Sequence, residues 1–208
     1  EGDGLVLRGQ HKKKLEIHRM QVYKGREKEG KRTRLIHAYH MASTEYEKAW
    51  EQAGWYMHRQ YGLSNTIVIS NGDGGTEYSY EAFQELTAGC KWHEHQRDVY
   101  HVHRKVKERL HFAALEIQKG VRQSIWNYDE TSLALWLDTA ESEAEGNDEL
   151  QDVERLRKYL KRNWTYVEPL SQRQIPEKVH LIQPGACEAG HRIYSYRMKH
   201  QGRCWSQE

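Results

Sequence analysis

The N-terminal part of the chain alternates apolar and polar residues, the pattern of strands with one face toward solvent. The alternation is clearest in residues 15–23, Leu-Glu-Ile-His-Arg-Met-Gln-Val-Tyr. Residues 1–7 and 34–41 are two further strand candidates, the second reached through a basic turn at residues 24–32. Because the connections are short, we expect these three strands to form an antiparallel meander.

A fourth strand candidate, residues 66–69, reads Thr-Ile-Val-Ile, in which every residue is β-branched. Such a run predicts a strand covered on both faces. We expect Asn71-Gly72 and Gly74-Gly75 to stop this strand abruptly, which would leave Asp73 at its C-terminal end. Binding sites of open α/β sheets form outside such ends. The same residues also fit an ordinary turn, in which Asp73 bonds only its own backbone.

Apolar residues at helical spacing predict several helices around this strand. Thr44-Glu45-Tyr46-Glu47 fits a capping box, so we expect a helix capped by Thr44 and closed by Gly62. The remaining predicted elements are a short helix around Phe83, a strand at residues 91–97, a helix from Tyr100 to Ile117, helix-rich residues 120–165 and a last helix from Ala186 to Gly202.

This order predicts an α/β fold of the ribonuclease-H type, with antiparallel strands 1–3, parallel strands 4–5 and flanking helices. We assign residues 1–118 to the core, 119–165 to a helical, acidic insertion, and 166–208 to a return to the core with the final helix. In that architecture strand 1 lies beside strand 4, which predicts that Asp3 lies near Asp73. Glu188 could join them from the final helix.

Composition is typical of a folded protein in a reducing compartment. The hydrophobic fraction is only 37%, but seven Trp and thirteen Tyr argue against disorder. Three widely spaced cysteines, Cys90, Cys187 and Cys204, do not make a disulfide framework, so we expect the cytoplasm. We expect no membrane helix, no signal peptide before the first strand and, since the chain begins without Met, a segment of a longer protein.

The net charge of +2 conceals a segregation of sign. Residues 138–154 hold eight acidic residues and no Lys or Arg, so this stretch is −8 and the remainder is +10. A basic remainder fits a polyanion such as nucleic acid, although basic surfaces also serve solubility alone. Arg104 and Lys105 lie on a predicted helix, where they are either DNA contacts or part of a solvated face.

Three carboxylates gathered in one pocket, Asp3, Asp73 and Glu188, would repel one another unless cations neutralised them. Hard divalent ions with oxygen ligands, Mg²⁺ or Mn²⁺, suit such a pocket. Two such ions can activate a water or a 3′-hydroxyl and stabilise the leaving oxygen of a phosphodiester. The sequence therefore predicts two-metal chemistry on nucleic acid.

In order and spacing, five stretches of the chain resemble bacterial insertion-sequence transposases of the ISLre group. These stretches are residues 1–4 (EGDG), 70–74 (SNGDG), 98–104 (DVYHVHR), 159–163 (YLKRN) and 185–206, which contains GACE, RMK and WS. That group, catalogued as an uncharacterised protein family, is similar to Mutator-like enzymes with a DDE triad.

The resemblance implies that Asp3, Asp73 and Glu188 are the catalytic, metal-binding triad of a transposase. It also implies that Asp98 and His101 form the Asp-x-x-His signature between the second and third acids. The implied partners are transposon ends and target DNA, bound by a dimer or larger assembly in the bacterial nucleoid. The candidate DNA contacts are Arg104, Lys105, Arg192, Arg197 and Lys199. Where the family usually has Ala and then Trp after the central Asp-Gly, this chain has Gly75, Glu77 and Tyr78.

Other functions remain open on the sequence. Cys90, His93, His95, His101 and His103 fall close together and could bind zinc, although their spacing matches no standard ligand pair. A catalytically inactive relative retained for binding DNA or a partner is a second alternative. A ribonuclease-H-type nuclease or resolvase would share the chemistry of the transposase.

Overall fold

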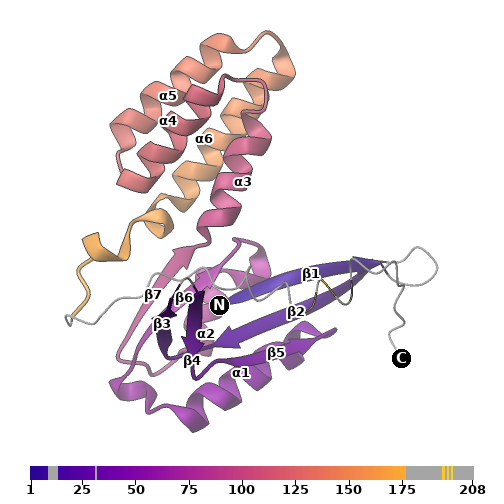
Figure 1. Ribbon diagram of the computed structural model, residues 1–208, viewed down its shortest axis with the longest axis vertical. Coiled ribbons are helices and arrows are strands. Elements are labelled where there is room, and N and C mark those ends of the chain that lie inside the picture. The colour runs from indigo at the N-terminus through magenta and orange to yellow at the C-terminus, as the bar shows by residue number, and fades with distance from the viewer. Residues whose placement is uncertain (9–13, 31, 177–193, 195, 197, 199–208) are drawn as a thin grey trace. The chain divides into compact units, whose positions relative to one another are not determined.

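The computed structural model describes residues 1–208 other than 9–13, 31, 177–193, 195, 197 and 199–208 (Figure 1). The chain divides into two compact units, residues 1–95 with 182–208, and residues 96–181. We call them the sheet unit and the helical unit. The helical unit begins well before the predicted insertion boundary at residue 119, because Val102 and Val106 join its hydrophobic cluster.

Among the described residues, five strands form the main sheet in the order β5-β2-β1-β6-β7. Strand β1 pairs with β2 antiparallel and with β6 in parallel, and β2 pairs with β5 antiparallel. This mixed sheet with flanking helices confirms the predicted ribonuclease-H-like fold. The strands are β1 (Gly2–Arg8), β2 (Lys14–Val22), β5 (Tyr39–Ser43), β6 (Ile67–Gly72) and β7 (Trp92–Arg97).

The third predicted strand, residues 34–41, is wrong as a single element. Strand β4 (Arg32–Ile36) and strand β5 are separated at His37, whose φ of 51° lies in the left-handed region and breaks the extended chain. The predicted basic turn is itself largely a strand, β3 (Gly25–Glu29), which pairs with β4. The described part of the chain thus has a separate two-stranded sheet before the third strand of the meander.

The predicted capping box at Thr44 is also wrong. Helix α1 (Tyr46–Gln60) has Glu45 at its N-cap, without a side-chain capping bond. The Glu45 N–H donates instead to Ser43 Oγ (3.0 Å). The apolar stripe of the helix was predicted correctly, because Ala49, Ala53 and Met57 are all buried.

Strand β6 runs further than its β-branched residues. Asn71-Gly72 was expected to stop the strand, but Ser70, Asn71 and Gly72 are its buried residues, whereas residues 67–69 are half-buried. The strand continues because Gly72 pairs with Gly2 of β1. A Cβ on Gly72 would lie 2.5 Å from the Tyr78 carbonyl oxygen, so only glycine allows this approach. The 3₁₀ turn η3 (Thr76–Tyr78) and helix α2 (Tyr80–Leu86) follow.

The two faces of the β1–β2 pair contact different hydrophobic clusters. Met20 packs with Met41, Tyr78, Phe83 and the buried alanines of α1. The alternate residues form the second cluster, Leu5, Leu7, Leu15 and Ile17, against which Tyr194 and Met198 pack. Residues 194, 196 and 198 are helical, in agreement with the last predicted helix.

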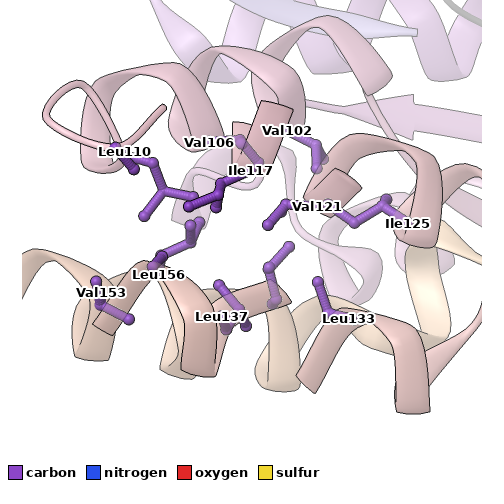
Figure 2. Packing of buried hydrophobic residues seen from close by; sticks show 13 residues of the cluster. Val102, Val106, Leu110, Ile117, Val121, Ile125, Leu133, Leu137, Val153 and Leu156 are labelled. Carbon is purple, nitrogen blue, oxygen red and sulfur yellow. The ribbon is translucent and has the colours of Figure 1, made fainter. Parts of the chain in front are cut away.

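In the described part of the helical unit, four helices pack around one aliphatic cluster (Figure 2). The predicted helix from Tyr100 to Ile117 is two helices, because Gln118 Nε2 donates to the carbonyl oxygens of Leu110 (2.8 Å) and Ala113 (3.1 Å) and so stabilises a turn. The helices are α3 (Val99–Arg109), α4 (Leu115–Asn127), α5 (Glu130–Glu143) and α6 (Asn147–Val167), and the 3₁₀ turn η4 (Leu170–Gln172) follows. None of the described helices is long and apolar enough to cross a membrane.

Candidate acidic site at the ends of β1 and β6

The parallel pairing of Gly2 with Gly72 brings Asp3 and Asp73 together, as the sequence predicted. Carboxylate oxygens of the two residues lie within 4.8 Å of each other. Asp3 is buried in β1, and Asp73 is half-exposed directly after β6. Two acids from distant parts of the chain therefore come together where the start of β1 pairs with the end of β6.

Asp73 is held in place by the glycines that follow it. The Gly75 N–H donates to Asp73 Oδ1 (2.8 Å), and Gly74 has a φ of 95°, which glycine adopts without strain. This is the turn that the sequence also allowed. The turn is compatible with a metal site, because the Gly75 N–H bonds only Oδ1 of Asp73 and a metal ion could bind the other oxygen.

A buried polar network runs along β2 beside Asp3. Arg19 faces Asp3 across the strand pair and is 1% exposed. Its Nη2 donates to Gln21 Oε1 (2.8 Å), and Gln21 Nε2 donates to Glu1 Oε2 (2.8 Å). The Tyr23 hydroxyl donates to Glu1 Oε1 (2.5 Å), and burial together with that carboxylate raises the pKa of Tyr23.

Arg19 is a neighbour of the candidate site that was not predicted from the sequence. The signal was available, since Arg19 shares the alternation of Ile17 and Leu15 and pairs with Asp3 once the strands are in register. The ring of Tyr194 lies 5.2 Å from Arg19 Cζ, a cation–π contact on the same face. Tyr194 therefore lies on the face of the sheet that carries Asp3.

Several predicted site residues lie outside the described part of the chain. These are the third acid and three of the predicted DNA contacts, namely Glu188, Arg192, Arg197 and Lys199. Their predicted roles stay predictions.

Asp98 and His101 meet at the start of α3, where Asp98 is the N-cap. Asp98 Oδ1 accepts from the Tyr100 N–H (2.8 Å) and the His101 N–H (3.4 Å), and His101 Nδ1 lies 3.6 Å from the same oxygen. Burial favours a higher pKa for Asp98, but His101 and the backbone N–H groups outweigh it, so the pKa lies below its ordinary value. The Asp-x-x-His pair thus stabilises the first turn of a helix.

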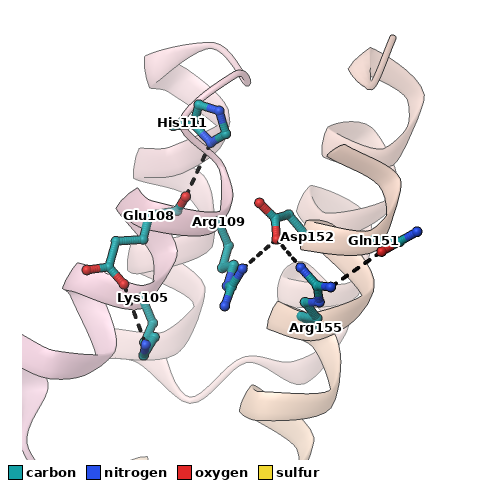
Figure 3. Close-up of polar contacts among 7 residues, drawn as sticks. All are labelled: Lys105, Glu108, Arg109, His111, Gln151, Asp152 and Arg155. Carbon is teal, nitrogen blue, oxygen red and sulfur yellow. Dashed lines mark hydrogen bonds and ion pairs between the residues drawn. The ribbon is translucent and has the colours of Figure 1, made fainter. Parts of the chain in front are cut away.

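Arg104 and Lys105 share one partner on α3. Arg104 Nε lies 2.7 Å from Glu108 Oε1, and Lys105 Nζ lies 3.5 Å from Glu108 Oε2. Nearby, Arg109 and Arg155 both contact Asp152, at 2.5 and 3.2 Å (Figure 3). The basic run is therefore paired in part with carboxylates, as a solvated helix face would be, and its DNA contacts stay a prediction.

The zinc candidates His93 and His95 converge on a hydroxyl group. Ser70 Oγ lies 2.7 Å from His93 Nε2 and 2.8 Å from His95 Nδ1. Burial lowers the pKa of His93 to about 4, so its ring is neutral at physiological pH. Within the described residues, no group of three metal-ligating side chains contains Cys90, His93 or His95.

Asp3 and Asp73 fit a hard divalent cation. Their ligands are carboxylate oxygens, which Mg²⁺ and Mn²⁺ prefer, and Mg²⁺ is usually held by one or two protein carboxylates. The separation of the oxygens lets one ion contact both after small side-chain rotations.

Comparison with known proteins places the chain in a family. The model of the Uncharacterised protein family (UPF0236) matches residues 1–208. The curated "UPF0236 protein in vanSb 3'region" of Streptococcus gallolyticus is 34% identical over 208 residues, which cover 99% of this chain and 45% of that protein. The chain thus spans about half the length of this relative. No solved structure matches this chain. The chain belongs to the uncharacterised protein family UPF0236.

Proposed function

We propose that this chain is the catalytic segment of an insertion-sequence DDE transposase. Such an enzyme cleaves phosphodiester bonds of DNA and joins the cut strand to a target strand by strand transfer. The observation that carries the proposal is the approach of Asp3 and Asp73 to within 4.8 Å between their carboxylate oxygens. If Asp73 served only to accept a backbone hydrogen bond in a turn, the buried carboxylate of Asp3 beside it would have no explanation. The ribonuclease-H-like sheet supports the same conclusion.

In this proposal Asp3, Asp73 and Glu188 hold two Mg²⁺ or Mn²⁺ ions. When bound, such ions activate a water or 3′-hydroxyl and stabilise the leaving oxygen. The chain's own contribution is a prepared set of ligands, because Asp3 is fixed within β1 and Asp73 is oriented by the Gly75 N–H. Transposon ends and target DNA are the proposed partners of a dimeric or larger assembly.

The direct test is nicking of supercoiled plasmid DNA by the chain with Mn²⁺, compared with Asp73→Asn. We expect Asp73→Asn to lower the rate by at least roughly 100-fold, because it removes a metal ligand while keeping the side-chain volume. Asp148→Asn is the matched control, since Asp148 is an exposed acid of the first turn of α6. Equal cleavage by the chain and by Asp73→Asn would refute the proposal.

Five basic residues are the proposed phosphate contacts: Arg104, Lys105, Arg192, Arg197 and Lys199. For each phosphate contact removed, the slope of log affinity against log salt concentration should fall by about 1. We expect this result for Lys199→Ala and for Lys105→Ala in a fluorescence anisotropy titration with duplex DNA. Lys158→Ala, which removes an exposed lysine paired with Glu154, is the control. An unchanged slope for Lys199→Ala would exclude its phosphate contact.

A second candidate is a catalytically inactive relative that binds DNA. It is favoured by Gly75, Glu77 and Tyr78 in place of the Ala and Trp that the family usually carries. The same two assays separate the candidates. Salt-dependent DNA binding without Mn²⁺-dependent nicking would support the inactive relative.

A further inference from the structure

A second group of metal-ligating side chains lies on the opposite face of β1 and β2 from Asp3. The register pairs Asp3 with Arg19 and Gly4 with His18. Since successive side chains of a strand alternate between faces, His18 and Glu16 project from the other face. There Glu16, His18 and Glu77 of η3 each offer a ligand atom, and these atoms all lie within 4.8 Å of one another.

His18 is the fixed member of this group. It is 7% exposed, and its ring meets the Tyr46 ring edge to face at 5.6 Å between centroids. Its Nδ1 lies 3.3 Å from Glu77 Oε2. Two ligands about 2.1 Å from one tetrahedral zinc ion lie roughly 3.3 to 3.4 Å apart. His18 and Glu77 therefore already have the spacing of two ligands to one ion.

Gly4 makes room for the third ligand. It faces His18 directly across the strand pair, and a Cβ on Gly4 would collide with Glu16 Oε1. The Glu16 carboxylate therefore lies over the backbone of β1, where any other residue would displace it. Glu16 is exposed and the side chain of Glu77 is 45% exposed, so an ion can reach both from solvent.

Two tyrosines support the group from behind. The Tyr46 hydroxyl donates to the Glu77 carbonyl oxygen (3.0 Å), which holds the backbone of η3 against α1. The Tyr78 hydroxyl lies 3.3 Å from His18 Nδ1.

We propose that Glu16, His18 and Glu77 bind one divalent transition-metal ion of the zinc class, at a site distinct from Asp3 and Asp73. An imidazole ligand favours Zn²⁺ or Co²⁺ over Mg²⁺, which prefers oxygen ligands. The competing explanation is a simple ion pair between His18 and Glu77.

The test is a titration of the chain with Co²⁺, followed by visible absorption, and with Zn²⁺, followed by calorimetry. An Asp73→Asn background removes the contribution of the acidic site. We expect one ion per chain, no competition from excess Mg²⁺, and affinity at least roughly tenfold lower in Glu77→Gln and Gly4→Ala. Glu51→Gln, an exposed glutamate of α1, should leave the affinity unchanged.

The proposal would be overturned in favour of the ion pair if the Asp73→Asn chain did not bind one Co²⁺ ion. The same would follow if adding Glu77→Gln left the affinity for Co²⁺ unchanged. His18→Gln is a third variant, and because His18 is buried its result counts only if circular dichroism shows the native fold. Glu77→Gln changes an exposed side chain and keeps the proposal falsifiable. The outcome is independent of the nuclease test, because Mn²⁺-dependent nicking is expected to require Asp73.

Discussion

The two units differ in the partners of their buried polar residues. The helical unit is built around an aliphatic cluster in which Val106 and Leu156 are almost completely buried, and its buried Asp98, Gln118 and Ser124 bond to backbone groups. The sheet unit buries Asp3, His18, Arg19, Gln21, Ser70 and His95 as well as its apolar residues. Burying polar groups costs free energy unless hydrogen bonds replace water. The buried polar groups of the helical unit thus fix helix ends and turns, as in a scaffold, whereas in the sheet unit the buried carboxylate of Asp3 lies beside that of Asp73, which stability alone would not select.

Acidic residues show the same contrast. In the helical unit, Arg157 contacts both Asp138 (3.0 Å) and Glu141 (2.9 Å). In the sheet unit, the carboxylates of Asp3 and Asp73 approach each other. The number of acidic residues therefore does not locate a metal site in this chain, because the whole acidic stretch, residues 138–154, lies in the helical unit. The arrangement of the carboxylates does.

The largest expected effect on stability is in the aliphatic core. Leu156→Ala should lower the free energy of unfolding of the helical unit by about 3 kcal/mol, since Leu156 is 1% exposed and its truncation leaves a cavity. Urea denaturation followed by circular dichroism measures the change. Leu150→Ala, at a position that is 41% exposed, should cost less than about 1 kcal/mol. Equal losses for the two variants would contradict the contrast between scaffold and site.

A glycine of the sheet unit should give the next largest effect. Gly72→Ala places a Cβ 2.5 Å from the Tyr78 carbonyl oxygen and should cost about 1–3 kcal/mol by overpacking. Because Gly72 pairs with Gly2, the variant should also lower Mn²⁺-dependent nicking, through displacement of Asp73 from Asp3. Gly62→Ala is the control, since a Cβ there meets nothing within 4 Å. Full activity of Gly72→Ala would show that the pairing does not position the acids.

The smallest expected effect concerns the cap of α3. Asp98→Ala should lower the free energy of unfolding by about 1 kcal/mol through loss of the N-cap. Asp98→Asn keeps a capping oxygen but removes the charge.

The pH dependence of the Asp98 contribution has a definite sign. The folded-state pKa of Asp98 is lowered, so its charge stabilises the fold above about pH 4, the ordinary pKa of Asp. That stabilisation is lost as the pH falls through the folded-state pKa. The stability difference between the chain and Asp98→Asn should therefore shrink as the pH falls below about 4. A difference that is constant across this range would show that the charge of Asp98 is not stabilising.

Much of the sheet could be predicted from the sequence, because alternation and β-branched runs are local patterns. The adjacency of Asp3 and Asp73 followed from the strand order, and the structure confirms it. The break at His37 could not be predicted, because a positive φ outside glycine has no reliable local pattern. The turn between α3 and α4 was not predicted because the apolar residues keep helical spacing through it. The bond from Gln118 to the Leu110 carbonyl oxygen, which stabilises the turn, leaves no pattern in the sequence.

The candidate site could be predicted only in part. Asp73 was identified from the end of a strand, but the opposing Arg19 required the register of β1 and β2. Asp98 was identified from a family motif, whereas its bonds to Tyr100 and His101 are those of an ordinary N-cap. The second metal-ligating group was not predicted. Glu77 lies far from His18 in the sequence, and the two meet only because β6 places η3 beside β2.

The packing of Tyr194 and Met198 against Leu5, Leu7, Leu15 and Ile17 has a consequence for synthesis on the ribosome. The strands that carry these aliphatic residues are translated long before Tyr194 and Met198, which lie more than 170 positions further along the chain. A nascent chain that has completed β2 therefore lacks these contacts until Tyr194 and Met198 have been translated. Contacts so distant in sequence slow folding, and the uncovered face is the kind of surface that chaperones bind.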